Sequence, residues 1–221
     1  MARPGGLRAR GLQPGSVLTV GLRDILTGRH TVAGPAPDRL FAITTAYVTL
    51  QAEHSIEPSG VAAIVFQALA TSEFEATLRD MEDVVKATGG DSGTTVSTQD
   101  DDYGYRWMVL RNQEGSPSVE DLAVGINAVS SSIETAGHGD RLLCAVFAFE
   151  DRSGAANVAK GRPVYFIYNY KRGFWYPFVP GEGSGNERST ERELQLKAQM
   201  ASELPIEPEL ERWFPLWGIP I

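Results

Sequence analysis

Apolar residues recur at helical spacing in three segments, which predicts three amphipathic helices over residues 72–89, 118–136 and 190–203. A short helix is also expected to open at Pro37. The three apolar stripes are Phe74, Leu78, Met81 and Val85; Leu122, Ile126, Val129 and Ile133; and Leu196, Met200 and Leu204.

Capping residues support two of these helices. Ser72 and Glu75 have the spacing of a capping box, in which each side chain satisfies a free backbone amide, and so do Thr190 and Glu193. Gly89 and Gly90 are expected to end the first helix, and Pro205 to end the last.

Continuous apolar or alternating runs predict the strands. Val61–Leu69 and Arg141–Glu150 are apolar on both faces, which is typical of central strands. Val164–Phe178 predicts a hairpin that turns at Lys171–Gly173. Two further strands are expected at Ala46–Ala52 and Tyr103–Arg111, with a turn at residues 54–60 and a polar loop at residues 91–102.

Strands outnumber helices in this pattern and mostly follow one another directly, which favours an α+β fold. We expect a two-layer plan in which a largely antiparallel sheet of about five to six strands packs with three main helices. This plan resembles secretion-chaperone folds. Residues 21–221 are expected to form one domain, whereas residues 1–20 are rich in Arg, Gly and Pro and predict a disordered extension.

Composition limits the classes of function. The net charge of −8 argues against non-specific binding to nucleic acid or to anionic lipid. No window holds the roughly 20 apolar residues that span a bilayer, and no signal peptide is recognisable. Cys144 is the single cysteine, which excludes an internal disulfide and suits a reducing compartment. The expected location is therefore the cytoplasm.

Motifs for catalysis or cofactors are weak throughout the chain. Gly90–Gly93 spells the serine-protease nucleophile motif, but His138 follows Ser92 in the wrong order for that family. Asp100–Asp102 lacks the spacing of a calcium loop, and Gly181–Gly185 contains an acid that would repel phosphate. The sequence thus predicts no catalytic residue, no cofactor and no metal site.

Two aromatic segments are candidate partner-binding surfaces. The hairpin tip carries Lys171, Arg172, Phe174 and Trp175, and the tail carries Trp213, Phe214 and Trp217. Tryptophan, tyrosine and arginine dominate binding hot spots, so both segments are plausible anchors. A solvated turn is the competing interpretation of the tip. For the tail, packing against its own domain is favoured, because it follows a helix in a domain whose sheet needs cover.

The chain resembles the actinobacterial PspA-associated protein family PspAB from Gly21 onward. The similarity rests on Asp38–Phe41 with Tyr47–Leu50, on Tyr103–Trp107, on Asn127–Ser132, on the hairpin Tyr168–Phe178, and on the ending Leu204–Pro208 with Arg212–Gly218. The resemblance implies an accessory role in the phage-shock, or envelope-stress, response. It also implies PspA-type or HtpX-type membrane-stress proteins as partners, and a location that reaches the inner membrane only through such a partner.

The family pattern begins near Val20, so residues 1–19 are expected to be a mis-assigned start if they are not a disordered extension. Our first hypothesis is a non-enzymatic adaptor that acts by protein–protein binding. The alternative is an enzyme of unknown type with a small-molecule cleft between sheet and helices, using acids such as Glu53 or Asp102. A homodimer through an edge strand of the hairpin stays open as a third interpretation.

Overall fold

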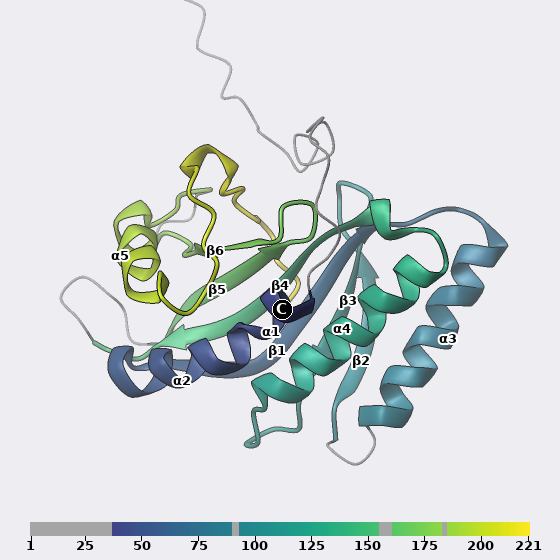
Figure 1. The fold of residues 1–221 in the computed structure, drawn as a ribbon, viewed down its shortest axis with the longest axis horizontal. Coiled ribbons are helices and arrows are strands. Elements are labelled where there is room, and N and C mark those ends of the chain that lie inside the picture. The colour runs from purple at the N-terminus through teal and green to yellow at the C-terminus, as the bar shows by residue number, and fades with distance from the viewer. Residues whose placement is uncertain (1–36, 90–92, 155–160, 183–184) are drawn as a thin grey trace, which may run out of the picture.

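The strands of this computed structural model, which describes residues 37–89, 93–154, 161–182 and 185–221, form one antiparallel sheet (Figure 1). Within those ranges the sheet has six strands in the order β2-β3-β1-β4-β5-β6. The strands are β1 (Ile56–Gln67), β2 (Thr95–Asp100), β3 (Tyr105–Arg111), β4 (Leu142–Asp151), β5 (Arg162–Asn169) and β6 (Phe174–Phe178). The expected α+β plan with a largely antiparallel sheet is confirmed.

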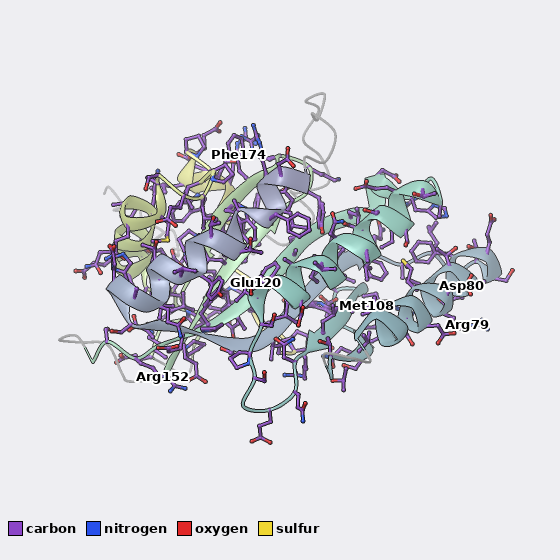
Figure 2. The ribbon with its side chains drawn as sticks, turned by 60° about the horizontal axis from the view of Figure 1, so that its bottom comes forward. Arg79, Asp80, Met108, Glu120, Arg152 and Phe174 are labelled. Atoms are coloured by element: carbon purple, nitrogen blue, oxygen red, sulfur yellow. The ribbon has the colours of Figure 1, made fainter. Side chains whose placement is uncertain are left out.

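Helices cover one face of the sheet (Figure 1). They are α1 (Pro37–Phe41), α2 (Ile43–His54), α3 (Ser72–Gly89) and α4 (Val119–Thr135), and α5 (Thr190–Met200) packs beside β6. Short 3-10 turns occur at Gly139–Arg141 and Leu210–Arg212. Gly125 allows α4 to approach β3 closely, because a β-carbon there would collide with Leu110. The main core therefore lies between the helices and the sheet, with Met108 of β3 inside it (Figure 2).

The opposite face of the sheet is covered by the C-terminal tail, residues 205–221. Trp213 and Leu216 are buried there in a second apolar cluster with side chains of β1, β3, β4, β5 and β6. The tail begins beside β6, where Ile206 bridges Trp175, and its Pro220 carbonyl accepts a hydrogen bond from Gln99 of β2 at 3.1 Å. It thus crosses the sheet from one edge to the other, and the favoured packing of the tail against its own domain is what the structure has.

Three sequence expectations about secondary structure are wrong. The expected strand Ala46–Ala52 is part of helix α2, whose buried residues Ile43, Ala46 and Leu50 follow helical spacing. The expected turn at residues 54–60 lies largely inside β1, which bulges between Pro58 and Val61. The polar loop at residues 91–102 contains strand β2, which is stabilised by its ladder with β3 although it lacks an apolar face.

The expected capping boxes are also wrong. The Thr71 hydroxyl, one residue earlier than expected, accepts the hydrogen bond from the Phe74 amide at the start of α3. At α5, Ser189 precedes the first helical residue and Glu193 turns inward to bind the Val179 amide. Helix α5 ends at Met200, before the expected Glu203, and Tyr103 lies outside β3 with 63% of its surface exposed.

The remaining elements agree with the sequence. Helices α3 and α4, strands β3 and β4 and the β5–β6 hairpin lie where the patterns predict them, and Ser118 caps α4 by accepting from the Asp121 amide. The expectations for residues 1–20 and for the protease-like motif at residues 90–92 lie outside the described residues.

Candidate functional surface

The tip of the β5–β6 hairpin is held by α1. Gly173 has a positive φ of 67°, which the tight turn requires and other residues rarely adopt. The Arg39 guanidinium donates to the Gly173 carbonyl at 3.1 Å and lies over the Phe174 ring, 5.2 Å from its centroid. Phe174 is therefore half-buried under an arginine, and the tip has a defined shape.

Trp175 is fully buried, so it cannot act as a surface anchor in this fold. Its indole N–H donates to the Arg39 carbonyl at 2.7 Å, and its ring packs against Tyr168 and Phe147. The aromatic ring and its polar group are thus both satisfied inside the molecule.

The two basic residues of the tip have different roles. Arg172 forms an ion pair with Glu207 of the tail, a carboxylate that is 2% exposed, and so ties the tip to the tail. Lys171 is half-buried and forms no ion pair with another described residue; burial lowers its pKa from the ordinary value, against the attraction of Asp140. Of the two, Lys171 is the cation that the fold leaves accessible.

The aromatic residues of the tail divide in the same way. Trp213 is buried, stacks on Tyr176 and donates its indole N–H to the Glu207 carbonyl at 3.0 Å. Phe214 and Trp217 are half-buried, and Trp217 packs edge-on against Phe178 with ring centroids 5.1 Å apart. Each of the latter two therefore keeps part of its ring in contact with solvent.

Three buried carboxylates fasten α5 and the tail to the sheet. Besides Glu207, they are Asp151 at the end of β4 and Glu193 in α5. Asp151 pairs with Arg192 at 2.7 Å, and Glu193 pairs with Arg188 at 2.7 Å. Buried carboxylates are costly without such partners, so these pairs hold the β6 side of the molecule together.

The pKa values of Asp151 and Glu193 shift in opposite directions. Burial favours the neutral form of both. At Asp151, hydrogen bonds from Ser153 and the charge of Arg192 outweigh burial, so its pKa lies below the ordinary value. At Glu193, burial outweighs the hydrogen bonds from Arg188 and the Val179 amide, so its pKa is raised.

Two open clefts are lined by residues other than these buried pairs. The first, of about 350 Å³, is lined at the bulged end of β1 by residues including Asn112, Glu150 and Arg152, and its Glu150 and Arg152 pair at 3.0 Å. The second, of about 390 Å³, is a shallow surface over Ser131, Ser132 and Thr135 of α4. Arg152 and the hairpin-tip Phe174 lie near opposite ends of the β4–β5 ladder, at the bottom and the top of the view in Figure 2.

The outer helical surface exposes two aliphatic side chains, Val48 of α2 and Val124 of α4. Between the same helices, the Tyr47 phenol hydrogen-bonds to Glu120 at the start of α4, which raises the pKa of Tyr47 above its ordinary value (Figure 2). Small patches of this kind are normal on soluble domains and do not by themselves mark a site.

The acids that the enzyme alternative would use are on the surface. Glu53 and Asp102 are both exposed and line neither cleft. Cys144 is buried, and burial raises the pKa of its thiol to about 12, which disfavours the reactive thiolate. Among the described residues, no group of three or more His, Cys, Asp or Glu side chains is arranged to hold a metal ion.

In the part of the chain that the structure describes, no helix combines the length and the apolar character needed to cross a bilayer. In a comparison with known families, the model of PspA associated protein B matches residues 20–221. The chain belongs to the PspA associated protein B family. The resemblance inferred from the hairpin and the Trp-rich ending is therefore confirmed. No curated protein and no solved structure matches the chain.

Within this family member, the fold brings together only some of the residues that the sequence nominated. Lys171 and Phe174 share the tip, whereas Trp175 and Trp213 are interior, and Arg172 is committed to Glu207. The buried acid–arginine pairs are not predicted from the sequence. Their signal was weak: Arg188, Arg192 and Glu193 lie close together in the sequence, but nothing in it identifies Asp151 as the partner of Arg192.

Proposed function

We propose that this protein is a non-enzymatic adaptor that binds a PspA-type protein of the envelope-stress response. Family membership is the observation that carries the proposal, because the family is described by its association with PspA. The proposal further includes a cytoplasmic location, with any approach to the inner membrane made through the partner.

The electrostatics of the fold support a binding role over a catalytic one. An active site usually gathers perturbed titratable groups in an enclosed pocket. Here the buried carboxylates Asp151, Glu193 and Glu207 are each engaged by an arginine that fastens a structural element. These three buried carboxylates are thus used to hold the tail and α5.

The accessible parts of the two aromatic segments supply the first candidate contacts. At the tip these are Lys171 and the Phe174 edge left free by Arg39, and on the tail they are the exposed parts of Phe214 and Trp217. Aromatic rings with fixed positions make efficient anchors, because they lose little conformational freedom on binding. Trp175 and Trp213 support these surfaces from beneath.

The test measures direct binding between the purified protein and the purified PspA-type protein of the same organism by biolayer interferometry. We expect the wild type to bind, and Lys171→Glu/Phe174→Ala to weaken binding about tenfold or more. Arg152→Glu, a charge reversal at the other end of the β4–β5 ladder, is the matched control and is expected to leave affinity unchanged.

The adaptor function would be contradicted if the wild type bound neither the PspA-type protein nor an HtpX-type metalloprotease tested in parallel. Equal binding by wild type and the tip variant would remove the hairpin tip from the interface while leaving the function intact. Thermal unfolding of each variant confirms that the comparison is made on folded protein.

A further inference from the structure

The two edge strands of the sheet differ in whether another segment pairs with their outer backbone groups. The outer edge of β6 is paired with the tail: the Trp175 amide donates to the Pro205 carbonyl at 2.9 Å, and the Glu207 amide donates to the Trp175 carbonyl at 2.8 Å. At the other edge, no described strand lies beyond β2. Strand β2 is therefore the edge at which another strand can be added.

The backbone groups that β2 turns outward follow from its ladder with β3. The Asp101 amide donates to the Tyr105 carbonyl at 2.9 Å, and antiparallel pairs alternate between hydrogen-bonded and non-hydrogen-bonded positions. Ser97 and Gln99 therefore bond to β3, whereas Val96, Thr98 and Asp100 direct their N–H and C=O groups to the open edge. These three alternate residues thus present a row of backbone groups that no other described strand pairs with.

Of the devices that protect exposed edges, β2 carries one charged residue, Asp100 at its end. Exposed edges are commonly blocked by a proline, a lysine or a bulge. Strand β2 has the sequence TVSTQD, and its register with β3 runs through six consecutive pairs without a shift. Both faces of an added strand would meet protein, because α3 contacts one side through Glu82 and Thr98 and the tail reaches the other through Gln99.

The charge around this edge selects the incoming strand. Acidic side chains lie around it: Glu75 and Glu82 of α3 contact Arg106 and Thr98, Asp100 is in β2, and Asp101 and Asp102 follow in the turn. Arg106 pairs with Glu75 and Asp100, and Arg79 lies on the exposed side of α3 (Figure 2). Because the side chain of Thr98 contacts Glu82 of α3 and Asp100 lies on the same face, every second residue of an added strand would face Asp100 and the acids of α3.

We propose that the β2 edge binds an extended segment of a partner protein that carries Lys or Arg at alternate positions, as a seventh strand of the sheet. Main-chain hydrogen bonds to Val96, Thr98 and Asp100 supply the pairing, and the acidic border supplies the preference for a basic segment. A second copy of this chain fits less well, because pairing β2 with β2 would bring two acidic borders together. The proposal depends on the adaptor function only in taking the partner to be a protein.

The probe is a short, fluorescein-labelled synthetic peptide in which lysine alternates with valine. Its binding is measured by fluorescence anisotropy. Its matched forms replace lysine by glutamate, or methylate the backbone amides that would pair with β2. We expect only the lysine peptide to bind and to shift the amide resonances of Val96, Thr98 and Asp100. Its affinity should fall as added salt screens the charges.

The decisive variant is Thr98→Pro, which removes an outward N–H that β3 does not use. Thr98→Ala is its control, because both substitutions lose the hydroxyl bonded to Glu82. We expect Thr98→Pro to lower the affinity for the lysine peptide about tenfold or more. Thr98→Ala should change that affinity less than about threefold. Asp102→Lys should weaken peptide binding as well, and Glu191→Lys on α5 should not.

The proposal is overturned if the lysine peptide fails to bind, if the methylated peptide binds equally well, or if the resonances that shift lie elsewhere. It is also overturned if the free protein sediments as a dimer that Thr98→Pro dissociates, because a second copy then occupies the edge. If Thr98→Pro keeps full affinity for the PspA-type protein, the adaptor function stands and the edge is not its site.

Discussion

The β6 side and the β2 side of the sheet show two ways of ending a sheet. The β6 edge is sealed by Pro205–Glu207 of the tail and surrounded by carboxylates that are almost wholly buried and paired with arginines. The β2 edge is a six-residue polar strand, and its ion pairs, such as Asp100 with Arg106, lie at the surface. The chain thus concentrates its costly buried charges on one side and leaves the other open.

The residues that stabilise this fold and the residues available for binding therefore lie at different edges of the sheet. Buried pairs are strongly destabilising to break, because each leaves a charge without a partner or water. Exposed pairs contribute little, because solvent screens them. We therefore expect substitutions near β6 to affect folding, and substitutions near β2 to affect association.

Trp175→Ala is expected to have the largest effect on stability. The side chain is fully buried between Tyr168 and Phe147, and its indole bonds to the Arg39 carbonyl. We expect a loss of about 4–5 kcal/mol in the free energy of unfolding, measured by urea denaturation. Tyr103→Ala, at a largely exposed ring, is the control; an equal loss in both would contradict the assignment of Trp175 to the core.

Asp151→Ala compares a buried pair with an exposed one. It leaves Arg192 unpaired in a side chain that is 11% exposed, so we expect a loss of about 3–4 kcal/mol. Asp100→Ala leaves Arg106 with Glu75 at the surface, and a loss of about 0–1 kcal/mol is expected. Similar losses in the two variants, measured by the same denaturation, would contradict the contrast between the sides.

The pH dependence of stability should report Asp151. Its pKa lies below the ordinary value of 3.8 in the folded protein, so the unfolded chain takes up the proton first as pH falls. The stability that the ionised form contributes is present above about pH 4 and is lost below it. Melting temperatures from pH 7 to pH 3 should show wild type and Asp151→Asn converging at the acidic end. A constant gap would mean that the charge of Asp151 is not responsible.

Proline substitutions should distinguish the β2 residues whose N–H groups bond to β3 from those whose N–H groups point to the open edge. Ser97→Pro removes a donor to β3 and is expected to cost about 1–3 kcal/mol. Thr98→Pro removes an outward donor and should cost less than about 1 kcal/mol. Thermal unfolding checks both variants, and an equal cost would show that the outward direction assigned to Thr98 is wrong.

The sequence predicted the strongly patterned half of this fold. Stripes such as Leu122, Ile126 and Val129 place α4 correctly, and the apolar run of β4 is a central strand. Two elements depend on tertiary context. Strand β2 is polar on both faces and is defined by pairing with β3, and α2 was mistaken for a strand because Tyr47, Val48 and Thr49 are typical of strands.

The candidate surface was predicted less completely than the fold. Aromatic residues in a hairpin and a tail indicate anchors, but sequence alone does not tell which ring faces inward. Trp175 alternates with Phe174 along β6, and the inward direction follows from the register with β5. The open β2 edge was not predicted at all, because finding an edge requires the strand order. A signal lay in the acids at Asp100–Asp102, which were assigned only to a solvated loop.

Amide hydrogen exchange of the free protein, resolved by residue, tests the contrast between the edges most directly. We predict that the Trp175 and Glu207 amides exchange slowly, because the tail pairs with β6, whereas the Thr98 amide exchanges near the rate of an unfolded chain. Protection of Thr98 equal to that of Trp175 would contradict the account, because it would show that the β2 edge is already occupied.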